Sequence, residues 1–177
     1  IASLPIIKST TGDFGTIKIG NKQIPVAANI VDQQASLYGH GCRNAGDTKI
    51  TFGTGAFAMT LSDGVDLTAS RDGLLPTIAW QLNGQEPVFA LDGGVYSAGS
   101  ALNWAISLGL FADFSEINSF NAPSAISRGI AFVPSLTGLG CPYWDSSAVG
   151  LWIGMSLDTT KHDMVQSVLE GIAFRAV

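Results

Sequence analysis

The sequence is poor in cysteine, in basic side chains and in long apolar runs. Its 177 residues include two cysteines, Cys42 and Cys141, and neither lies in a CxxC or Cys/His spacing suited to a metal. We expect two reduced thiols and no metal site built from protein side chains. Nine Lys and Arg stand against fourteen Asp and Glu, without a basic cluster, which disfavours nucleic acid and anionic membranes as partners. Because no run reaches transmembrane length and no signal peptide is visible, we expect a soluble cytoplasmic protein.

Apolar residues are abundant instead. They make up 46 %, against 13 % charged residues, which allows a sizeable core and disfavours disorder.

The length suits one medium domain or a piece of a larger protein. Both ends favour a piece. The first residue is Ile1, and a predicted final helix, which Thr160 and Asp163 open as an S/T-x-x-D signal, reaches Val177 without a stop signal. We therefore expect a fragment, truncated at its C-terminal end.

The pattern of apolar residues predicts an α/β or α+β domain with a mixed sheet. Residues 14–20 and 24–31 are predicted strands, and the second is apolar enough for a central buried position. Helical residues follow Asp32, and residues 48–64, TKITFGTGAFAMTLSDG, predict a β-hairpin around a Gly-Thr-Gly turn. The other predicted elements are strands over 76–82 and 87–94, a helix over 95–111, a helix with polar loops over 112–127, short strands within 129–140 and 148–157, and the final helix.

The hairpin tip Gly53-Thr54-Gly55 is a first candidate site. It has no bulky side chain to block a ligand, its N–H groups can form an anion-binding nest, and the Thr54 hydroxyl adds a donor, which together suit a phosphate. A tight turn alone would also explain the glycines.

A second candidate lies in residues 91–104, LDGGVYSAGSALNW. A glycine inside a helix costs about 1 kcal/mol relative to alanine, so Gly99 indicates a packing or a ligand reason. With Asn103 one turn later it offers a flat patch beside an amide, on which adenine or ribose could lie. Helix-on-sheet packing explains Gly99 equally well.

Asp32 is the third candidate, because it stands where an apolar stretch gives way to a helix, with Gln33 and Gln34 behind it. Aspartate is among the best helix N-caps, which is the structural explanation. The chemical alternative is a catalytic carboxylate.

Four segments in this order resemble the C-terminal domain of the FGGY carbohydrate kinases: VDQQASLYGHG, TKITFGTGAF, FALDGGVYSAGSALNW and FVPSLTGLGCPYWD. Residues 150–170 resemble the second signature of that family. Its fixed positions fall on Gly150, Gly154, Asp163, Ser167 and Glu170. Within the family, DQQA, GLGCPYWD and the leading LPIIKSTTGDFGTI resemble the members that phosphorylate glycerol.

The resemblance implies a ribonuclease-H-like domain of the actin and hexokinase ATPase type, with flanking helices. Residues 1–177 would form most of the second of two domains that close around a cleft. It implies that Asp32 is the catalytic base and that Gln33 and Phe57 contact the substrate. The implied nucleotide contacts are Gly53, Thr54, Gly55, Gly99 and Asn103. It also implies ATP and Mg²⁺ as cofactors and allows a homo-oligomer. Two departures are Val31, where the family has glycine, and Asn103, where many members that phosphorylate glycerol have glutamine.

Three hypotheses follow for the function. The first is an ATP-dependent polyol kinase that makes glycerol 3-phosphate as the full-length protein. This fragment would be inactive alone, without the N-terminal domain and without an adenine-binding Asp-Gly-Gly segment beyond Val177. The second is another FGGY kinase, for a pentulose or a sugar acid. The third is a non-catalytic module on the same scaffold, which the loss of Asp32 or of the Gly-Thr-Gly tip would have favoured. Structural roles are expected for Trp80, Trp104 and Trp144 in packing and for Asp145 as a loop cap.

Overall fold

The computed structural model describes residues 3–64 and 72–176, and its internal contacts divide the chain into two compact units. The first unit contains the described residues of Ile1–Lys49, Met59–Arg71 and Leu75–Asp92. The second contains the described residues of Ile50–Ala58, Asp72–Leu74 and Gly93–Val177. The single domain expected over residues 1–177 stays a prediction.

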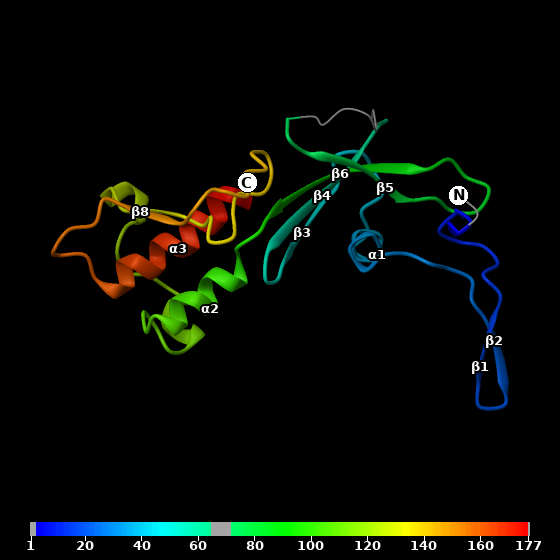
Figure 1. The fold of residues 1–177 in the computed structure, drawn as a ribbon, viewed down its shortest axis with the longest axis horizontal. Helices are drawn as coiled ribbons and strands as arrows, with labels where there is room; N and C mark the ends of the chain where they lie inside the picture. Colours follow the sequence, from blue (N-terminus) through cyan, green and yellow to red (C-terminus); the bar gives the residue numbers. More distant parts are fainter. Residues whose placement is uncertain (1–2, 65–71, 177) are drawn as a thin grey trace. The chain divides into compact units, whose positions relative to one another are not determined.

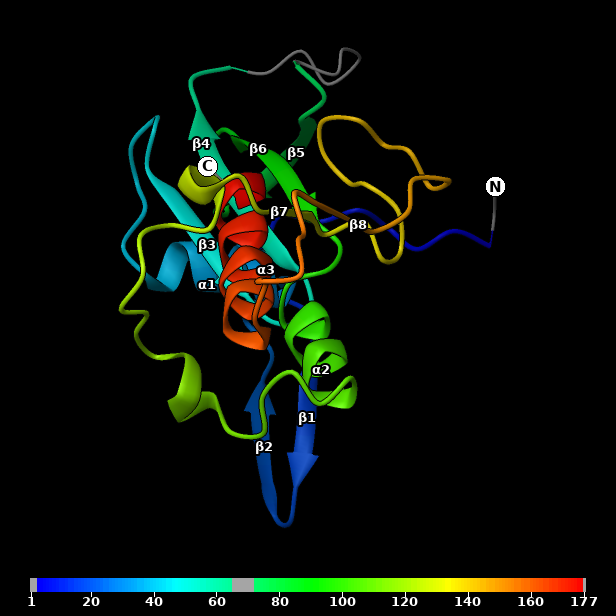
Figure 2. The same ribbon diagram turned by 90° about the vertical axis from the view of Figure 1, so that its left-hand side faces the viewer.

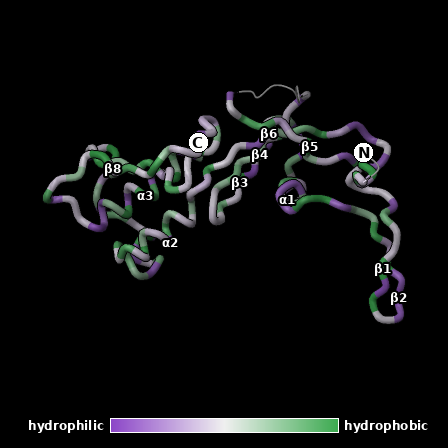
Figure 3. Tube along the Cα trace, viewed as in Figure 1, coloured by the Kyte–Doolittle hydropathy of each residue, from purple (hydrophilic) through white to green (hydrophobic). Residues whose placement is uncertain are grey.

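Strands β1 (Thr16–Ile19) and β2 (Lys22–Pro25) form an antiparallel hairpin whose residues are all exposed. The strand predicted over 14–20 is confirmed, but the buried central strand over 24–31 is wrong. Beyond Pro25 the chain runs on outside any strand, and Ile30 is 36 % exposed. In Figure 3 part of this stretch is the green segment of the tube that leads into α1. An apolar run by itself does not distinguish a buried strand from an exposed one.

A four-stranded sheet has the order β3-β4-β6-β5 (Figure 1). Its strands are β3 (Thr48–Phe52), β4 (Ala56–Ser62), β5 (Leu75–Trp80) and β6 (Val88–Val95). The last two pair antiparallel. The turn Gly53-Thr54-Gly55 joins β3 to β4, so the predicted hairpin is confirmed, as are the strands predicted over 76–82 and 87–94.

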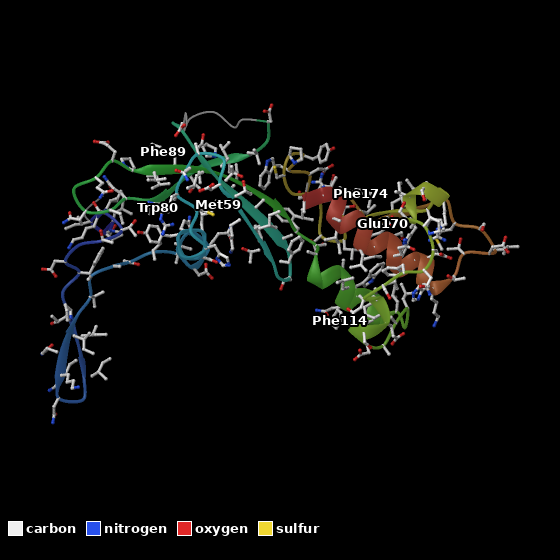
Figure 4. All side chains as sticks on the ribbon, turned by 180° about the vertical axis from the view of Figure 1, so that it is seen from behind. Met59, Trp80, Phe89, Phe114, Glu170 and Phe174 are labelled. Atoms are coloured by element: carbon white, nitrogen blue, oxygen red, sulfur yellow. The ribbon has the colours of Figure 1, made fainter. Side chains whose placement is uncertain are left out.

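Helix α1 (Asp32–Gly39) contributes to the core of the first unit. This core is formed by buried Leu37, Cys42, Met59, Leu61, Ala79, Trp80 and Ala90. Met59 and Trp80 are labelled in Figure 4. The Trp80 ring is 4 % exposed and meets the Tyr38 ring edge to face, with 5.0 Å between centroids. The packing role predicted for Trp80 is therefore confirmed.

The second unit contains the remaining helices and a small antiparallel pair. They are α2 (Gly99–Ser107), the 3₁₀ turns η1 (Phe114–Ile117) and η2 (Ile126–Arg128), strands β7 (Ala131–Val133) and β8 (Leu151–Ile153), and α3 (Lys161–Ala176). Helix α3 packs along β7 and against α2, as the two ribbon views show (Figures 1 and 2). Apolar side chains of α2, α3, β7 and β8 pack in two clusters that share Leu102, and Ile117 of η1 packs against the second cluster. Val177, in the predicted final helix, lies outside the described residues.

The helix predicted over 112–127 is wrong, because the segment forms only η1 and η2 with loops around them. Asp113 and Glu116 make a capping box, which starts a single 3₁₀ turn. Downstream, the N–H groups of Ala125 and Ile126 donate to the Glu170 carboxylate of α3, at 2.8 and 3.0 Å. A tertiary partner thus takes backbone donors that a helix would have used.

The start of α3 follows the predicted capping signal. The Asp163 carboxylate accepts from the Thr160 N–H at 2.9 Å and from its hydroxyl at 2.7 Å, and the Asp163 N–H donates to Thr160 Oγ1 at 3.2 Å. Arg128 forms an ion pair with the same carboxylate. The Thr160 hydroxyl and N–H, and then the Arg128 guanidinium, lower the pKa of Asp163 to about 2. None of the described helices is long and apolar enough to cross a membrane.

Candidate active site

Asp32 is the first residue of α1 and is exposed. The N-cap is Val31, which has an extended backbone (φ −71°, ψ 146°) and no side-chain capping bond. The interpretation of Asp32 as N-cap is therefore wrong by one position. Val31, directly before it, occupies the N-cap position, and Asp32 is the first residue with helical backbone. Asp32 Oδ1 accepts from the Gln33 N–H at 2.7 Å, and a carboxylate in a first turn is favoured by the helix dipole. Its other oxygen makes no hydrogen bond within the part of the chain that the structure describes.

Gln33 is half-buried, and its Nε2 lies 3.4 Å from Asp92 Oδ1, at the long end of the range for a hydrogen bond. Asp92 therefore joins Asp32 and Gln33 in the first unit. Asp92 was not among the predicted site residues, although it has the same signal as Asp32: an acid that follows an apolar run. Behind them, Gln34 Oε1 is buried and has no partner among the described residues.

The hairpin tip lies in the second unit, with Thr54 exposed between Gly53, also exposed, and Gly55, which is buried. The Gly53 N–H donates to the Gly55 carbonyl at 2.8 Å and is used inside the turn. An anion at this tip would therefore meet fewer backbone donors than three free N–H groups would give. The Thr54 hydroxyl makes no hydrogen bond to any described residue.

The same tip is joined to the start of α2 by hydrogen bonds. The Ala98 N–H, the Ser100 N–H and the Ser100 hydroxyl all donate to the Thr54 carbonyl at 3.0 Å, and the Gly99 N–H donates to the Gly53 carbonyl at 2.9 Å. We call these residues, Gly53, Thr54, Ala98, Gly99 and Ser100, the tip–helix joint. Two candidates that were separate in the sequence are thus one structure.

Backbone proximity explains the glycine at position 99. A Cβ atom there would lie 2.5 Å from the Gly53 carbonyl oxygen, and one at Gly55 would lie 2.7 Å from the Val95 carbonyl oxygen. Real Cβ atoms do not approach backbone oxygens so closely. The sequence left a packing reason and a ligand reason open for Gly99. The structure supports the packing reason, and a contact between Gly99 and a nucleotide stays a prediction.

Asn103 and Phe57 complete the set in the second unit. Asn103 is exposed on α2, four positions after Gly99. Phe57 is on β4 and 37 % exposed, and its ring lies against Gly94, where a Cβ would come within 2.9 Å of two ring carbons. Asp32 and Gln33 belong to the first unit and the other six predicted site residues to the second.

The loop residues with expected structural roles are placed as follows. Asp145 Oδ1 accepts from the N–H and the hydroxyl of Ser147, at 2.8 and 2.6 Å, and these two bonds, the hydroxyl first, hold its pKa below the usual value. The loop-cap prediction is confirmed. Trp144 is 40 % exposed, and its indole N–H donates to the Gly73 carbonyl at 2.6 Å. Trp104 is half-buried and packs against the core, as predicted.

Comparison with known proteins defines the class. Residues 48–177 match the C-terminal domain of the FGGY family of carbohydrate kinases, and the chain belongs to this family. The fold predicted from the sequence is confirmed, because the mixed α/β structure matches the C-terminal, actin-like ATPase domain of a glycerol kinase.

Individual relatives narrow the comparison. The glycerol kinase of Geobacter sp. (strain M21) is 41 % identical over 177 residues, covering 98 % of this chain and 35 % of the relative. The structure of Plasmodium falciparum glycerol kinase with ADP superposes with a TM-score of 0.82 at 33 % identity, over 98 % of this chain and 35 % of that chain. A xylulose kinase from Rhodospirillum rubrum, at 22 % identity and a TM-score of 0.75 over 97 % and 36 %, shares the fold. This chain thus spans about a third of the length of these proteins.

Proposed function

We propose that the full-length protein is an ATP-dependent kinase that phosphorylates a polyol hydroxyl, with glycerol as substrate and glycerol 3-phosphate as product. The main support is that the chain is 41 % identical to a glycerol kinase and has an exposed carboxylate, Asp32, at the start of α1 and an exposed Thr54 at the hairpin tip. The ADP named with the Plasmodium structure supports a nucleotide as the second reactant.

In this proposal Asp32 accepts the proton of the attacking hydroxyl. As the hydroxyl oxygen bonds to the terminal phosphorus of ATP, the bond from that phosphorus to the bridging oxygen of ADP breaks. The Asp32 oxygen that has no partner among the described residues is available for the proton. Gln33 binds a second hydroxyl, and the Phe57 ring packs on the carbon chain of the polyol. Proton removal by a positioned base contributes about 10²–10⁴-fold in rate.

The tip–helix joint fits a nucleotide. Thr54 is exposed at the tip, and Asn103 is exposed on α2, the helix that begins at the joint. Thr54 would donate to phosphate oxygens, with the backbone of Gly53 and Gly55 beside it, and Gly99 and Asn103 would contact the nucleoside. ATP supplies the transferable phosphoryl group.

Mg²⁺ is part of the proposal only as a companion of the nucleotide. No group of three His, Cys, Asp or Glu side chains in the described ranges 3–64 and 72–176 could hold a metal ion. Mg²⁺ commonly keeps several waters and is bound through substrate phosphates. We therefore assign no step and no protein ligand to it.

The test is an assay of the purified full-length protein with ATP and Mg²⁺ against glycerol, a pentulose and a sugar acid. We expect kcat/KM for glycerol to exceed the others by at least about tenfold, since one pocket contact changes discrimination by roughly that factor. A preference for a pentulose or sugar acid would replace the substrate within the same family. No turnover of any substrate would favour the non-catalytic module.

The 177-residue chain alone should show no kinase activity. It spans about a third of the length of its relatives, and holding two reactants in the correct mutual orientation can lower a reaction barrier by on the order of 7–11 kcal/mol. ATP-dependent phosphorylation of glycerol by the purified 177-residue chain would contradict this expectation.

A further inference from the structure

Three aromatic rings from separate elements meet in the core of the second unit. They are Trp104 of α2, Phe132 of β7 and Trp152 of β8. The Trp104 ring stacks on Trp152 at 5.3 Å between centroids and on Phe132 at 5.9 Å, and Phe132 lies 4.6 Å from Trp152. Contacts of this kind prefer defined offsets between rings, so the position of one ring limits that of the next.

One hydrogen bond fixes the Trp152 ring within this group. Its indole N–H donates to the Ser167 hydroxyl oxygen of α3 at 3.0 Å, and the Ser167 hydroxyl donates to the Met164 carbonyl at 2.7 Å. Ser167 is 1 % exposed. Since the hydroxyl proton is directed to Met164, its oxygen is left as the acceptor for the indole. Without that acceptor a half-buried N–H would lack a partner, which destabilises this ring position.

Helix α3 also has contacts that do not involve the three ring side chains. A Cβ at Gly171 would lie 2.3 Å from the Phe132 carbonyl oxygen, so the backbones of α3 and β7 are close. Farther round the helix, the Gln166 amide donates to the Pro123 carbonyl at 3.0 Å and to the Glu170 carboxylate at 2.9 Å, and Glu170 in turn holds two backbone N–H groups. A change at Ser167 should therefore displace Trp152 before it displaces α3.

The other end of this chain of contacts is α2. Trp104 follows Asn103 directly, and Gly99 opens the same helix at the tip–helix joint. The helix is thus fixed at its start by backbone hydrogen bonds and in its middle by the stack of Trp104 on Trp152. The hydrogen bonds of the tip–helix joint fix the first residues of α2. The stack of Trp104 on Trp152 restricts the rotation of α2 about its helix axis.

We propose that Ser167 is a positioning residue for the nucleotide. Through Trp152 and Trp104 it fixes the rotation of α2, and thereby the direction of the Asn103 amide beside Gly99. This inference rests on the proposed nucleotide role of α2 and adds a residue that touches neither reactant.

The experiment measures two dissociation constants in the full-length protein, one for ADP and one for glycerol, by calorimetry. Ser167→Ala should raise the ADP constant about three- to tenfold, leave the glycerol constant within about twofold, and lower the melting temperature by a few degrees. Ser127→Ala is the matched control, because its hydroxyl also donates to a backbone carbonyl, that of Ser124 at 2.7 Å, but it is exposed and outside the ring group. It should change neither constant.

A conservative partner variant separates positioning from general damage. Trp152→Phe keeps a ring and removes the donor, so the double variant Ser167→Ala/Trp152→Phe leaves no unpaired indole N–H. Its effect on ADP binding should be smaller than the product of the two single effects. If Ser167→Ala does not fold, Trp152→Phe alone should still raise the ADP constant selectively.

The outcomes distinguish this inference from the proposed function. Unchanged ADP binding by folded Ser167→Ala and Trp152→Phe proteins, alongside weakened binding by Asn103→Ala, overturns the inference and leaves the proposed function standing. Equal losses for ADP and glycerol show a general structural role and also overturn it. If the unsubstituted protein binds no ADP, the proposed function fails, and the inference fails with it.

Discussion

The two groups of candidate site residues are built in opposite ways. Asp32 presents a side chain from the exposed start of α1 and makes one hydrogen bond, to the N–H of the next residue. The tip–helix joint is made of main chain: three backbone N–H groups and one hydroxyl donate to two carbonyls. At Gly99 even a single added carbon would collide with one of those carbonyls.

Under the proposed function, Asp32 has a chemical role and the tip–helix joint an architectural one. A group that must change protonation can sit on a side chain that little else depends on. At the joint, in contrast, glycine leaves room for neighbouring backbone, and the proposed function places a nucleotide beside it. Substitution should therefore separate activity from stability at Asp32 and should impair both at Gly99.

The largest expected effect is that of Asp32→Asn in the full-length protein. The amide can still accept from the Gln33 N–H, so stability should change by less than about 1 kcal/mol. It cannot take the hydroxyl proton, so turnover should fall about 10²–10⁴-fold while ADP still binds. Steady-state kinetics and thermal melting measure the two effects.

The matched control is Asp13→Asn, because Asp13 also accepts a nearby backbone N–H, that of Gly15 at 2.8 Å. It should leave turnover unchanged. A folded Asp32→Asn protein with near-normal turnover would show that Asp32 is not the catalytic base. The proposed contrast between a chemical role at Asp32 and an architectural role at the tip–helix joint would then be wrong.

Gly99→Ala should impair both stability and binding. The added Cβ would stand 2.5 Å from the Gly53 oxygen, and overpacking of this kind typically costs about 1–3 kcal/mol. Nucleotide binding should weaken about tenfold or more as the joint opens. Gly39→Ala, at the end of α1 with nothing within 4 Å of the new Cβ, should be neutral or slightly stabilising. Equal melting temperatures for the two variants would show that the joint can relax.

Asp163 sharpens the comparison, since it is a carboxylate near a helix start that does have structural partners. Its pKa is lowered to about 2 in the folded chain, below the ordinary unfolded value. Its stabilising contribution is therefore complete above about pH 4 and disappears as the pH falls through about 2. Asp163→Asn should lower the free energy of unfolding by on the order of 1–2 kcal/mol at neutral pH. Denaturant titrations should show the gap to wild type closing between these two pH values, and a gap independent of pH would contradict this assignment.

The smallest expected effect belongs to Asn103→Ala. A neutral amide hydrogen bond contributes about 1 kcal/mol, so the nucleotide constant should rise less than about tenfold and the polyol constant should stay unchanged. Calorimetry with ADP and with glycerol decides it. Equal damage to both constants would make Asn103 a structural residue.

Local signals predicted much of the fold. The Gly-Thr-Gly turn between alternating strands predicted the hairpin, and the Thr160–Asp163 spacing predicted the start of α3, because in both cases the deciding contacts lie within a few residues. The segment 112–127 was mispredicted because side chains take backbone donors at both of its ends: Glu116 accepts those of Ala112 and Asp113, and Glu170, far along the chain, accepts those of Ala125 and Ile126. Residues 24–31 were mispredicted as a buried central strand because apolar content alone does not report burial.

The candidate site was predictable as a set of residues but not as an arrangement. Gly99 and the hairpin tip each gave a weak signal, and nothing local indicates that their backbones touch across more than forty positions. Asp92 beside Gln33 was missed for the same reason. The exact residue that caps α1 depended on backbone angles at Val31, which a pattern of residue types does not give.

The tip–helix joint also has an electrical consequence. The first peptide groups of α2 carry the positive end of the helix dipole, and they donate to the carbonyls of Gly53 and Thr54. A peptide whose oxygen accepts hydrogen bonds is polarised, and its N–H becomes a stronger donor, by perhaps 10–30 % per bond in condensed-phase estimates. The N–H groups of Thr54 and Gly55 belong to those two peptides. The hydrogen bonds from the start of α2 thus make the N–H groups of Thr54 and Gly55 stronger donors, in a turn that carries no cationic side chain.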